Sequence, residues 1–590
     1  MTNFLLEIGT EEMPADFSQQ VINQLSQKVA VDLERLQLQH GIIHSTSTPR
    51  RIVLIIEELA EFSSDLVSEC KGPPLNQAFI DGVPTQAANG FAKRNGLEPK
   101  DLEIRDTPKG SFVFAKNIEK GKPTLNLLSE LIPNWIDALE GKRFMRWGEG
   151  DRRFSRPIRW MVSMLGEKIV PFNLKGCDPS IKTSNVTRGL RIKDDYLSLG
   201  SANDYSEIHM NTGIIIDRKS RKSFIKNLIN EGSKKYKAIP DIPSKLIEEL
   251  TDLVEKPSLI IGEFDCSYLS LPPEVLTTVM KVHQRYVPLY KSQKDEIDSL
   301  LLDSEATLYP QFLCISNGPI EANNRIKKGN ERVLKARLAD AKFFVESDLS
   351  ISSVKRLDQL KEVAFSAGLG SLFDRVKRIE WIVKFLIKEI DGPIINEESL
   401  TRAALLCKHD LVSQMVGEFP ELEGVIGGKY LLYENEDRQV ALAVSEHYLP
   451  RGSGDPIPQS DSGSMLALAE RLELLLSIFS KGNRPSGSSD PYALRRAGNG
   501  IVQILFAKSW SFDVNFALIK LIEYWSDIFP DFKIDRQNLL ADLSDFFRQR
   551  IISQLDEYKI DSDLIQAVAG NTIPIDRLLS DPADIRLRAE

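Results

Sequence analysis

Hydrophobic and polar positions follow two different patterns in the two halves of the chain. In the first half, short apolar or β-branched runs predict strands at residues 3–8, 51–57, 111–118, 259–264 and 312–317. A helix is predicted after Pro14, because apolar side chains recur there at intervals of three or four residues. These positions are Phe17, Val21, Leu25, Val29, Leu33 and Leu36.

From about residue 320 onward, segments with helical periodicity follow one another. They cover residues 321–347, 371–390, 397–417, 428–448, 464–479, 491–508 and 537–558. Loops rich in Gly, Pro and Ser separate some of them, at 450–463 and 481–490, and residues 581–590 form a charged end without an evident packed terminus. The pattern predicts an α+β multidomain protein with a mixed α/β N-terminal half and an all-α C-terminal half.

Composition limits the class of protein. The length of 590 residues suggests roughly four domains. Lys and Arg total 75 against 84 Asp and Glu, which gives a net charge of −9 and argues against a nucleic-acid-binding surface spread over the whole chain. Five scattered cysteines without a CxxC pair favour a reducing cytoplasm. The acidic N-terminus and the short apolar runs predict neither a signal peptide nor a membrane span.

Common catalytic signatures are absent from the sequence. It contains no GxxxxGK[ST], HExxH or GxSxG motif and no Cys/His zinc set. His409-Asp410 is a dyad of the kind that HD-type phosphohydrolases use to hold a metal, but no other histidine lies between His283 and His409. Two ligands make a weak metal site. We therefore expect no metal site at His409-Asp410 and interpret this pair as a surface or structural dyad.

Basic residues gather in a few segments of this acidic chain. The first segment also contains Phe144, Trp147, Phe154 and Trp160, and its cations are Lys142, Arg143, Arg146, Arg152, Arg153, Arg156 and Arg159. Arginine binds phosphate and aromatic rings stack on unpaired bases, so this mixture suits an RNA surface. An equally open interpretation is a structural region, in which the aromatic side chains are core and the arginines pair with carboxylates.

Other basic segments add to this picture. At helical spacing, Lys328, Arg332 and Lys335 share one helix face, with Arg325 one turn earlier. A smaller cluster consists of Arg484, Arg495 and Arg496. Residues 218–237 are also rich in Lys and Arg, but such runs are more often solvated helix faces. Segments that align in space would form a phosphate-binding groove despite the negative total charge.

Several motifs, in order along most of the chain, closely resemble those of one known family. They are LLEIGTEEMPA at 5–15, TPRR at 48–51, KGPP at 71–74, GFA at 90–92, MRWG at 145–148, FSRP at 154–157, LPPEVL at 271–276, GNE at 329–331, ARLADA at 336–341, EFPEL at 418–422 and DPYALRR at 490–496. The family is the beta subunit of bacterial heterotetrameric glycyl-tRNA synthetase.

The resemblance implies a division of labour. In this enzyme type the alpha subunit carries the catalytic core and uses ATP and Mg²⁺, the beta subunit mainly binds and orients glycine tRNA, and the two assemble as α2β2. The resemblance then implies no catalytic residue and no cofactor on this chain, and neither a DNA nor a membrane partner. It also implies a cytoplasmic location. The resemblance also implies an HD-like helical domain and a helical anticodon-binding domain, of which residues after about 511 resemble only the beginning.

The expected organisation is therefore a mixed α/β tRNA-binding region at 1–319, a basic connecting helix at 320–350, an HD-like domain at 351–510 and part of an anticodon-binding domain at 511–590. The expected function is support of glycine attachment to tRNA as part of a glycine–tRNA ligase complex. Two alternatives stay open at this point: an HD-type metal-dependent phosphohydrolase, and a tRNA-binding subunit of a tRNA-dependent amidotransferase.

Overall fold

The chain is divided between two compact units. The computed structural model describes residues 1–108, 110–193, 195–487 and 489–589. Unit 1 consists of Met1–Gly262, Arg285–Val287 and Leu313–Gly329, and unit 2 of Glu263–Gln284, Pro288–Phe312 and Asn330–Glu590. The α+β class is confirmed, with the sheets concentrated in the first half and helices filling the second. The finer domain boundaries expected from the sequence stay predictions.

A seven-stranded sheet forms the centre of unit 1, with the strand order β11-β12-β9-β1-β3-β2 and β10 paired to β9. All pairings in it are antiparallel except β9 with β12. The strands are β1 (Thr2–Thr10), β2 (Ile43–Thr48), β3 (Arg51–Leu59), β9 (Ile158–Leu165), β10 (Lys168–Ile169), β11 (Asn173–Leu174) and β12 (Ile181–Ser184).

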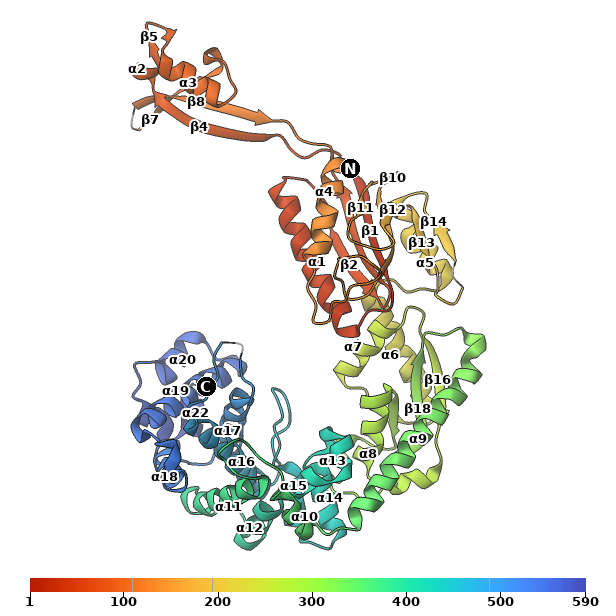
Figure 1. Cartoon of the computed structure of the whole chain (residues 1–590), viewed down its shortest axis with the longest axis vertical. Helices are drawn as coiled ribbons and strands as arrows, with labels where there is room; N and C mark the ends of the chain where they lie inside the picture. The colour runs from red at the N-terminus through yellow and green to blue at the C-terminus, as the bar shows by residue number, and fades with distance from the viewer. Residues whose placement is uncertain (109, 194, 488, 590) are drawn as a thin grey trace. The chain divides into compact units, whose positions relative to one another are not determined.

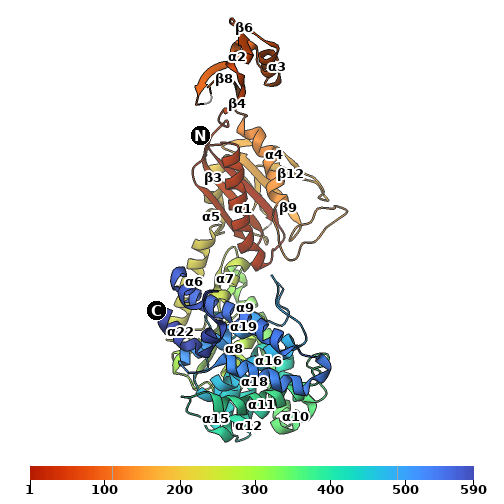
Figure 2. The ribbon, with the colours of Figure 1, turned by 90° about the vertical axis from the view of Figure 1, so that its left-hand side faces the viewer.

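Helices α1 (Ala15–Arg35) and α4 (Thr124–Asp137) cover one face of this sheet (Figures 1 and 2). The predicted stripe on α1 is confirmed, since Phe17, Val21, Leu25, Val29 and Leu33 are all buried. On β1, side chains alternate between the two faces, so Phe4, Leu6 and Ile8 meet the helices. The indole N–H of Trp135 on α4 donates to Asp32 on α1 at 3.0 Å, which joins the two helices.

The opposite face of the sheet carries a smaller hydrophobic cluster. It includes Leu5, Val53, Val162 and Tyr205. The segments after β12 are β13 (Val186–Arg188), β14 (Tyr196–Ser198), α5 (Tyr205–Thr212), α6 (Arg218–Lys234), β15 (Ile239–Pro240), α7 (Ser244–Leu253) and β16 (Ser258–Glu263). The register pairs Arg188 on β13 with Tyr196 on β14.

An insertion between β3 and α4 has its own small core of Ala78, Ala88, Ala92, Leu102, Val113 and Ala115. It consists of β4 (Leu66–Pro74), α2 (Leu75–Ala78), β5 (Phe79–Ile80), β6 (Val83–Pro84), α3 (Gln86–Arg94), β7 (Glu103–Thr107) and β8 (Gly110–Glu119). At its base, Ser63 donates its backbone N–H to Lys122 and Thr124 to Glu61. These bonds hold the two connecting segments together.

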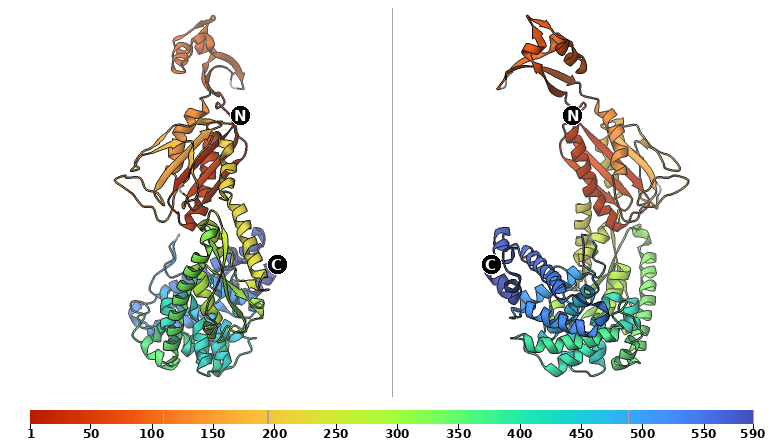
Figure 3. Two further views of the ribbon diagram at one scale, coloured as in Figure 1. Left: turned by 90° about the vertical axis from the view of Figure 1, so that its right-hand side faces the viewer. Right: turned by 60° about the vertical axis from the view of Figure 1, so that its left-hand side comes forward.

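Unit 2 is built mainly from helices (Figure 3), most of which contribute to one hydrophobic core. Strands β17 (Val287–Tyr290) and β18 (Leu308–Ser316) each run across a unit boundary. The helices from this part onward are α8 (Pro273–Thr278), α9 (Asn323–Leu349), α10 (Ser353–Leu360), α11 (Leu372–Glu389), α12 (Glu397–Leu406), α13 (Gln414–Glu418), α14 (Val425–Tyr433), α15 (Arg438–Glu446), α16 (Asp461–Ser480), α17 (Leu494–Lys508), α18 (Val514–Ile528), α19 (Arg536–Glu557), α20 (Ser562–Ala569), α21 (Ile575–Ser580) and α22 (Pro582–Ala589).

Three predictions for the helical half were wrong. The helix expected at 397–417 is broken into α12, a 3₁₀ turn at His409–Val412 and α13. The helix expected at 428–448 is two helices, α14 and α15, because the chain turns at Asn435 with a φ of 65°. The charged end is the helix α22, on which Ala583, Ile585 and Ala589 are buried.

Buried ion pairs connect α11 with α16. The Glu473 carboxylate on α16 accepts hydrogen bonds from Arg375 at 2.6 Å and from Arg378 at 2.9 Å. Glu470, one helical turn earlier, accepts from Arg375 at 2.7 Å and from Lys408 at 3.2 Å. All five side chains are largely or fully buried. Each carboxylate therefore neutralises two cations inside the core.

His409 and Asp410 hold the start of α14. The Oδ2 atom of Asp410 accepts the backbone N–H groups of Gly424 at 2.6 Å and Gly427 at 3.1 Å, and His409 Nε2 lies 3.1 Å from the Gly427 carbonyl oxygen. Burial raises the pKa of Asp410 to about 6 and lowers the pKa of His409 to about 3. A carboxylate that receives the free N–H groups of a helix end has a structural role.

Replacing Glu473 by Gln is expected to destabilise the protein. The change removes a charge that faces two buried guanidinium groups, and loss of one partner of a buried pair costs roughly 3–5 kcal/mol. Urea unfolding followed by circular dichroism measures this loss. Glu362→Gln, at an exposed position, serves as the matched control and is expected within about 0.5 kcal/mol of wild type. Equal stability of the two variants would contradict the role given to Glu473.

Replacing Asp410 by Asn is expected to change how stability depends on pH. Folding raises the pKa of Asp410 from 3.8 to about 6, so the folded state favours the protonated form. The wild type therefore loses folding stability as the pH rises from about 4 through 6. The asparagine side chain does not titrate, and its carbonyl oxygen can still accept the two N–H groups. The variant should therefore gain up to about 3 kcal/mol relative to wild type between pH 4 and pH 7.

The measurement is the urea midpoint at several pH values, with the exposed Asp531→Asn as control. A difference between wild type and Asp410→Asn that stays constant with pH would refute this assignment.

Candidate nucleic-acid interface

The first basic segment forms a loop between α4 and β9. Met145 and Phe154 pair across it through two backbone hydrogen bonds, of 2.8 and 3.1 Å. This bridge places Arg146 and Arg153 next to each other, one on each side of the loop. Four exposed cations of this segment make no hydrogen bond or ion pair with any described residue. They are Lys142, Arg143, Arg146 and Arg153.

The other cations of the same segment are engaged within the protein. Arg152 pairs with Asp137 and donates to the Lys175 carbonyl at 2.8 Å. Arg159 pairs with Glu11 at 2.7 Å, and Arg156 donates to the Ser155 carbonyl at 2.7 Å. The segment is thus divided between cations that hold the loop and cations that are free to meet an anionic ligand.

The aromatic residues of this segment belong mainly to the core. Phe154 is 1% exposed and packs edge-on against Phe17 on α1, as does Phe144. Trp160 is 7% exposed, and Trp147 packs against the same core. The structural interpretation is therefore right for these rings, and base stacking on them is excluded for Phe154 and Trp160.

The second basic segment lies on α9. Arg325, Lys328, Arg332 and Lys335 are all exposed on this helix. The buried side of α9 carries Leu334, Leu338, Ala341 and Val345. One amphipathic helix thus presents a row of cations on the side opposite its core contacts, as the spacing predicted.

Only part of the arginine cluster near α17 is open to contact with a ligand. Arg484 pairs with Asp542 at 2.7 Å, and its guanidinium lies 4.5 Å from the centroid of the Phe479 ring. Arg495 is half-buried, whereas Arg496 is exposed and lines a small hollow with Ser453, Asn499 and Gln503. Of these three arginines, Arg496 is the one best placed to contact a ligand.

The run at 218–237 is partly structural. Arg218 on α6 pairs with Asp252 at 2.6 Å and with Glu248 at 2.7 Å, and Lys222 also pairs with Glu248. Arg221 is fully buried and donates to backbone carbonyl groups of Thr251, Ile215, Ile216 and Ser47. Much of the charge in this run therefore holds α6 against its surroundings.

A charged cluster that was not predicted from the sequence lies on the sheet face opposite α1. Arg51 on β3 is fully buried, pairs with Glu255 and with Glu7 on β1, and donates to the backbone carbonyls of Arg188 and Gly189. Burial raises the pKa of Glu7 despite Arg51, whereas Arg51 outweighs burial at Glu255 and lowers its pKa. The TPRR motif at 48–51 was the only signal for it.

Trp160 lies at the centre of this cluster. In the sheet register, Gly9 on β1 is the neighbour of both Trp160 and Arg51. The indole covers Gly9 so closely that a Cβ atom there would lie 1.9 Å from the ring. The guanidinium carbons of Arg50, Arg51 and Arg188 lie 5.3, 5.4 and 5.1 Å from the centroid of this ring. Three arginines thus surround one tryptophan.

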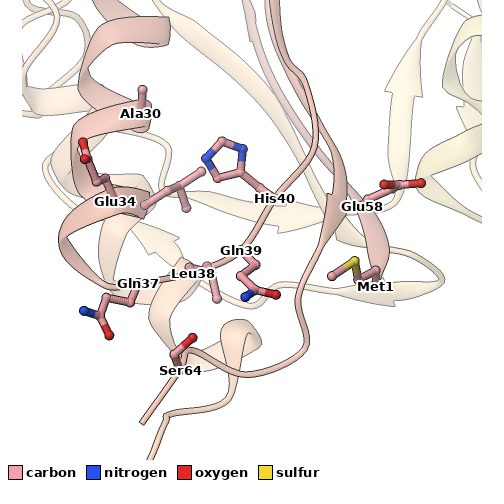
Figure 4. Close-up of a pocket in the computed structure, with 10 residues that line it drawn as sticks. Met1, Ala30, Glu34, Gln37, Leu38, Gln39, His40, Glu58 and Ser64 are labelled. Carbon is pink, nitrogen blue, oxygen red and sulfur yellow. The ribbon is translucent and has the colours of Figure 1, made fainter. Parts of the chain in front are cut away.

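A shallow hollow at one edge of unit 1 has a different character (Figure 4). Glu34 on α1, Glu58 on β3 and His40 between them lie around it. Among the described residues that line the hollow there is no lysine or arginine, which makes it unsuited to an RNA phosphate.

No group of three or more His, Cys, Asp or Glu residues is arranged to hold a metal ion within the described residues. His409 and Asp410 hold a helix start, as described above. The five cysteines are free thiols. Among the helices of the described residues, none combines the length and the apolar character needed to cross a membrane.

Comparison with known proteins gives one consistent result. The family model described as glycyl-tRNA synthetase beta subunit matches residues 4–570. The glycine–tRNA ligase beta subunit of Trichodesmium erythraeum is 45% identical over 594 aligned residues, covering 100% of this chain and 81% of that protein. The corresponding subunits of Gloeothece citriformis and Synechocystis sp. are 40% and 39% identical, again over 100% of this chain and 81% of theirs.

These matches run through the free cations at 142–153 and through α9, so both surfaces lie inside the region that the family shares. They also agree with the motifs quoted from the sequence. The chain belongs to the glycyl-tRNA synthetase beta subunit family, and it acts in glycyl-tRNA synthesis as part of an aminoacyl-tRNA synthetase complex.

Proposed function

We propose that this chain binds glycine tRNA and orients it for an alpha subunit that performs the chemistry, in an α2β2 assembly. The observation that carries the proposal is the set of four exposed cations at 142–153 that have no partner among the described residues. Unpaired arginines and lysines on a loop held by a rigid sheet suit contacts with RNA phosphates. The family membership supports an alpha subunit and tRNA as partners.

The cations of α9 extend the same proposal. A rigid helix keeps Arg325, Lys328, Arg332 and Lys335 at fixed spacing, which favours contacts along an RNA backbone over contacts with a single anion. The net charge of −9 then limits non-specific binding, because the chain as a whole carries the same sign of charge as RNA. Binding is directed to a few basic segments.

The chemistry itself is assigned to the partner. We infer that ATP and Mg²⁺ bind to the alpha subunit, and that this chain contributes by holding the tRNA in a productive orientation. Residues 511–590 are proposed to belong to an anticodon-binding domain, and residues 351–510 to form an HD-like domain whose dyad has a structural role. We also propose a cytoplasmic location, which suits five free thiols.

The first expected outcome concerns division of labour. The purified chain alone should neither form glycyl adenylate nor charge tRNA, and charging should appear when the alpha subunit is added. Pyrophosphate exchange with glycine and transfer of labelled glycine to tRNA measure the two steps. Adenylate formation by this chain alone would refute the proposal. Equal binding of glycine tRNA and other tRNAs would instead favour a more general tRNA-binding subunit.

The second expected outcome concerns the loop at 142–153. Arg146→Ala and Arg153→Ala should each weaken tRNA binding, and each should reduce the slope of log affinity against log salt by about one, because each removes one phosphate contact. Fluorescence anisotropy with labelled glycine tRNA at several KCl concentrations measures both quantities. Arg35→Ala, an exposed arginine that pairs with Asp32, is the matched control. Unchanged slopes for both variants would show that this loop is structural.

A further inference from the structure

The guanidinium group of Arg50 is a buried cation without a hydrogen-bond acceptor among the described residues. It lies in the turn between β2 and β3 and is 6% exposed. Its Nε and Nη1 atoms are buried and unpartnered, and no described residue accepts a hydrogen bond from its side chain. Burial lowers the pKa of the Arg50 guanidinium, and the charge of Arg51 adds to this effect, while Glu255 opposes it. Burying a charged group without hydrogen-bond acceptors costs free energy of folding, unless a ligand supplies the acceptors.

The carboxylates near Arg50 are engaged elsewhere. Glu255 Oε1 accepts from Arg51 and from Thr48, the latter at 2.6 Å, and Glu7 pairs with Arg51 at 3.1 Å. At the rim, Glu11 pairs with Arg159 and Glu12 with Arg191. Three guanidinium groups around Trp160 thus face two carboxylates, and both of those carboxylates bind the same arginine. The three guanidinium groups therefore exceed the two carboxylates by one positive charge, and Arg50 and Arg188 are the two that these carboxylates do not bind.

Arg188 is held in place from several sides. Its backbone carbonyl accepts from Arg51, and its guanidinium carbon lies 5.1 Å from the Trp160 centroid and 5.3 Å from the Tyr196 centroid. Its Nε atom is buried and unpartnered. The guanidinium groups of Arg50 and Arg188 therefore both lie against aromatic rings, and each keeps a buried N–H group without an acceptor among the described residues.

Tyr196 adds a second kind of contact. It is 64% exposed and lies opposite Arg188 in the β13–β14 ladder. An exposed ring beside the guanidinium group of Arg188 is a combination that suits an unpaired nucleotide, through base stacking and phosphate contact.

We propose that Arg50, Arg188 and Tyr196 form a binding site for one unpaired nucleotide of the bound RNA. Its phosphate meets the two guanidinium groups and its base stacks on Tyr196. This inference rests on the proposed tRNA-binding function and adds a specific subsite to it, separate from the loop at 142–153. A free phosphate compound shares the phosphate chemistry, and the experiment distinguishes the two sources.

The test is a titration of the full chain, with the alpha subunit present, against labelled glycine tRNA at about 50 to 200 mM KCl. Arg50→Gln and Arg188→Gln should each raise Kd by about tenfold and reduce the salt slope by about one. Tyr196→Ala should raise Kd by about fivefold or more without a change of slope, whereas Tyr196→Phe should match wild type because the ring is kept. Arg35→Gln is the matched control and should also match wild type.

Thermal unfolding separates this role from a structural one. Inorganic phosphate should raise the unfolding temperature of the wild type but not that of Arg50→Gln. Without phosphate, Arg50→Gln should unfold at or above the wild-type temperature, because the substitution removes an uncompensated buried charge. A lower unfolding temperature for Arg50→Gln, together with an unchanged salt slope, would overturn the inference.

The possible failures are distinguishable. Slopes reduced by Arg146→Ala and Arg153→Ala but unchanged by Arg50→Gln and Arg188→Gln would overturn this subsite and leave the proposed function standing. No tRNA binding by the wild-type complex would overturn the proposed function. If phosphate still stabilised the wild type in that case, the ligand would be a free phosphate compound, and the assignment to RNA would be overturned.

Discussion

The buried guanidinium of Arg51 is the interaction on which the organisation of unit 1 depends. It joins β3 to β1 through Glu7, to the segment after α7 through Glu255, and to the β13 region through two backbone carbonyls. These segments are far apart in the sequence. Because removing either partner would leave a charge without solvent or counter-ion, the arrangement is fixed by desolvation as much as by attraction. Trp160, Arg50 and Arg188 take their positions from it.

Unit 2 uses the same kind of constraint on helices. Glu470 and Glu473 lie one turn apart on α16 and neutralise cations from α11 and from the start of the 3₁₀ turn after α12. Lys408 is fully buried, and its ammonium lies 3.0 Å from His447 Nε2 and 3.9 Å from the Tyr448 centroid. A protein cation thus occupies the interior beside the dyad. This arrangement agrees with a structural role for the dyad.

The surface shows how an acidic chain can present basic sites. Many arginines that form a patch in the sequence, such as Arg152, Arg159, Arg218 and Arg484, are neutralised by neighbouring carboxylates. Exposed cations of the described basic segments lie on the loop before β9 and on the outer side of α9. The distinction depends on which carboxylates the fold brings near, and spacing along the chain does not reveal it.

The sequence by itself determined the class of fold, the amphipathic helix α1, most strands of unit 1 and the family, because these depend on local periodicity and on contiguous motifs. It did not reveal the break between α14 and α15, the packed helix α22, or the burial of Phe154 and Trp160. Nor did it show that Arg50 is left unpartnered while Arg51, its neighbour, binds two carboxylates. Only the tertiary structure decided these points, because burial and charge pairing depend on residues that can be far apart in the sequence, such as Arg51 and Glu255, which are separated by 204 positions.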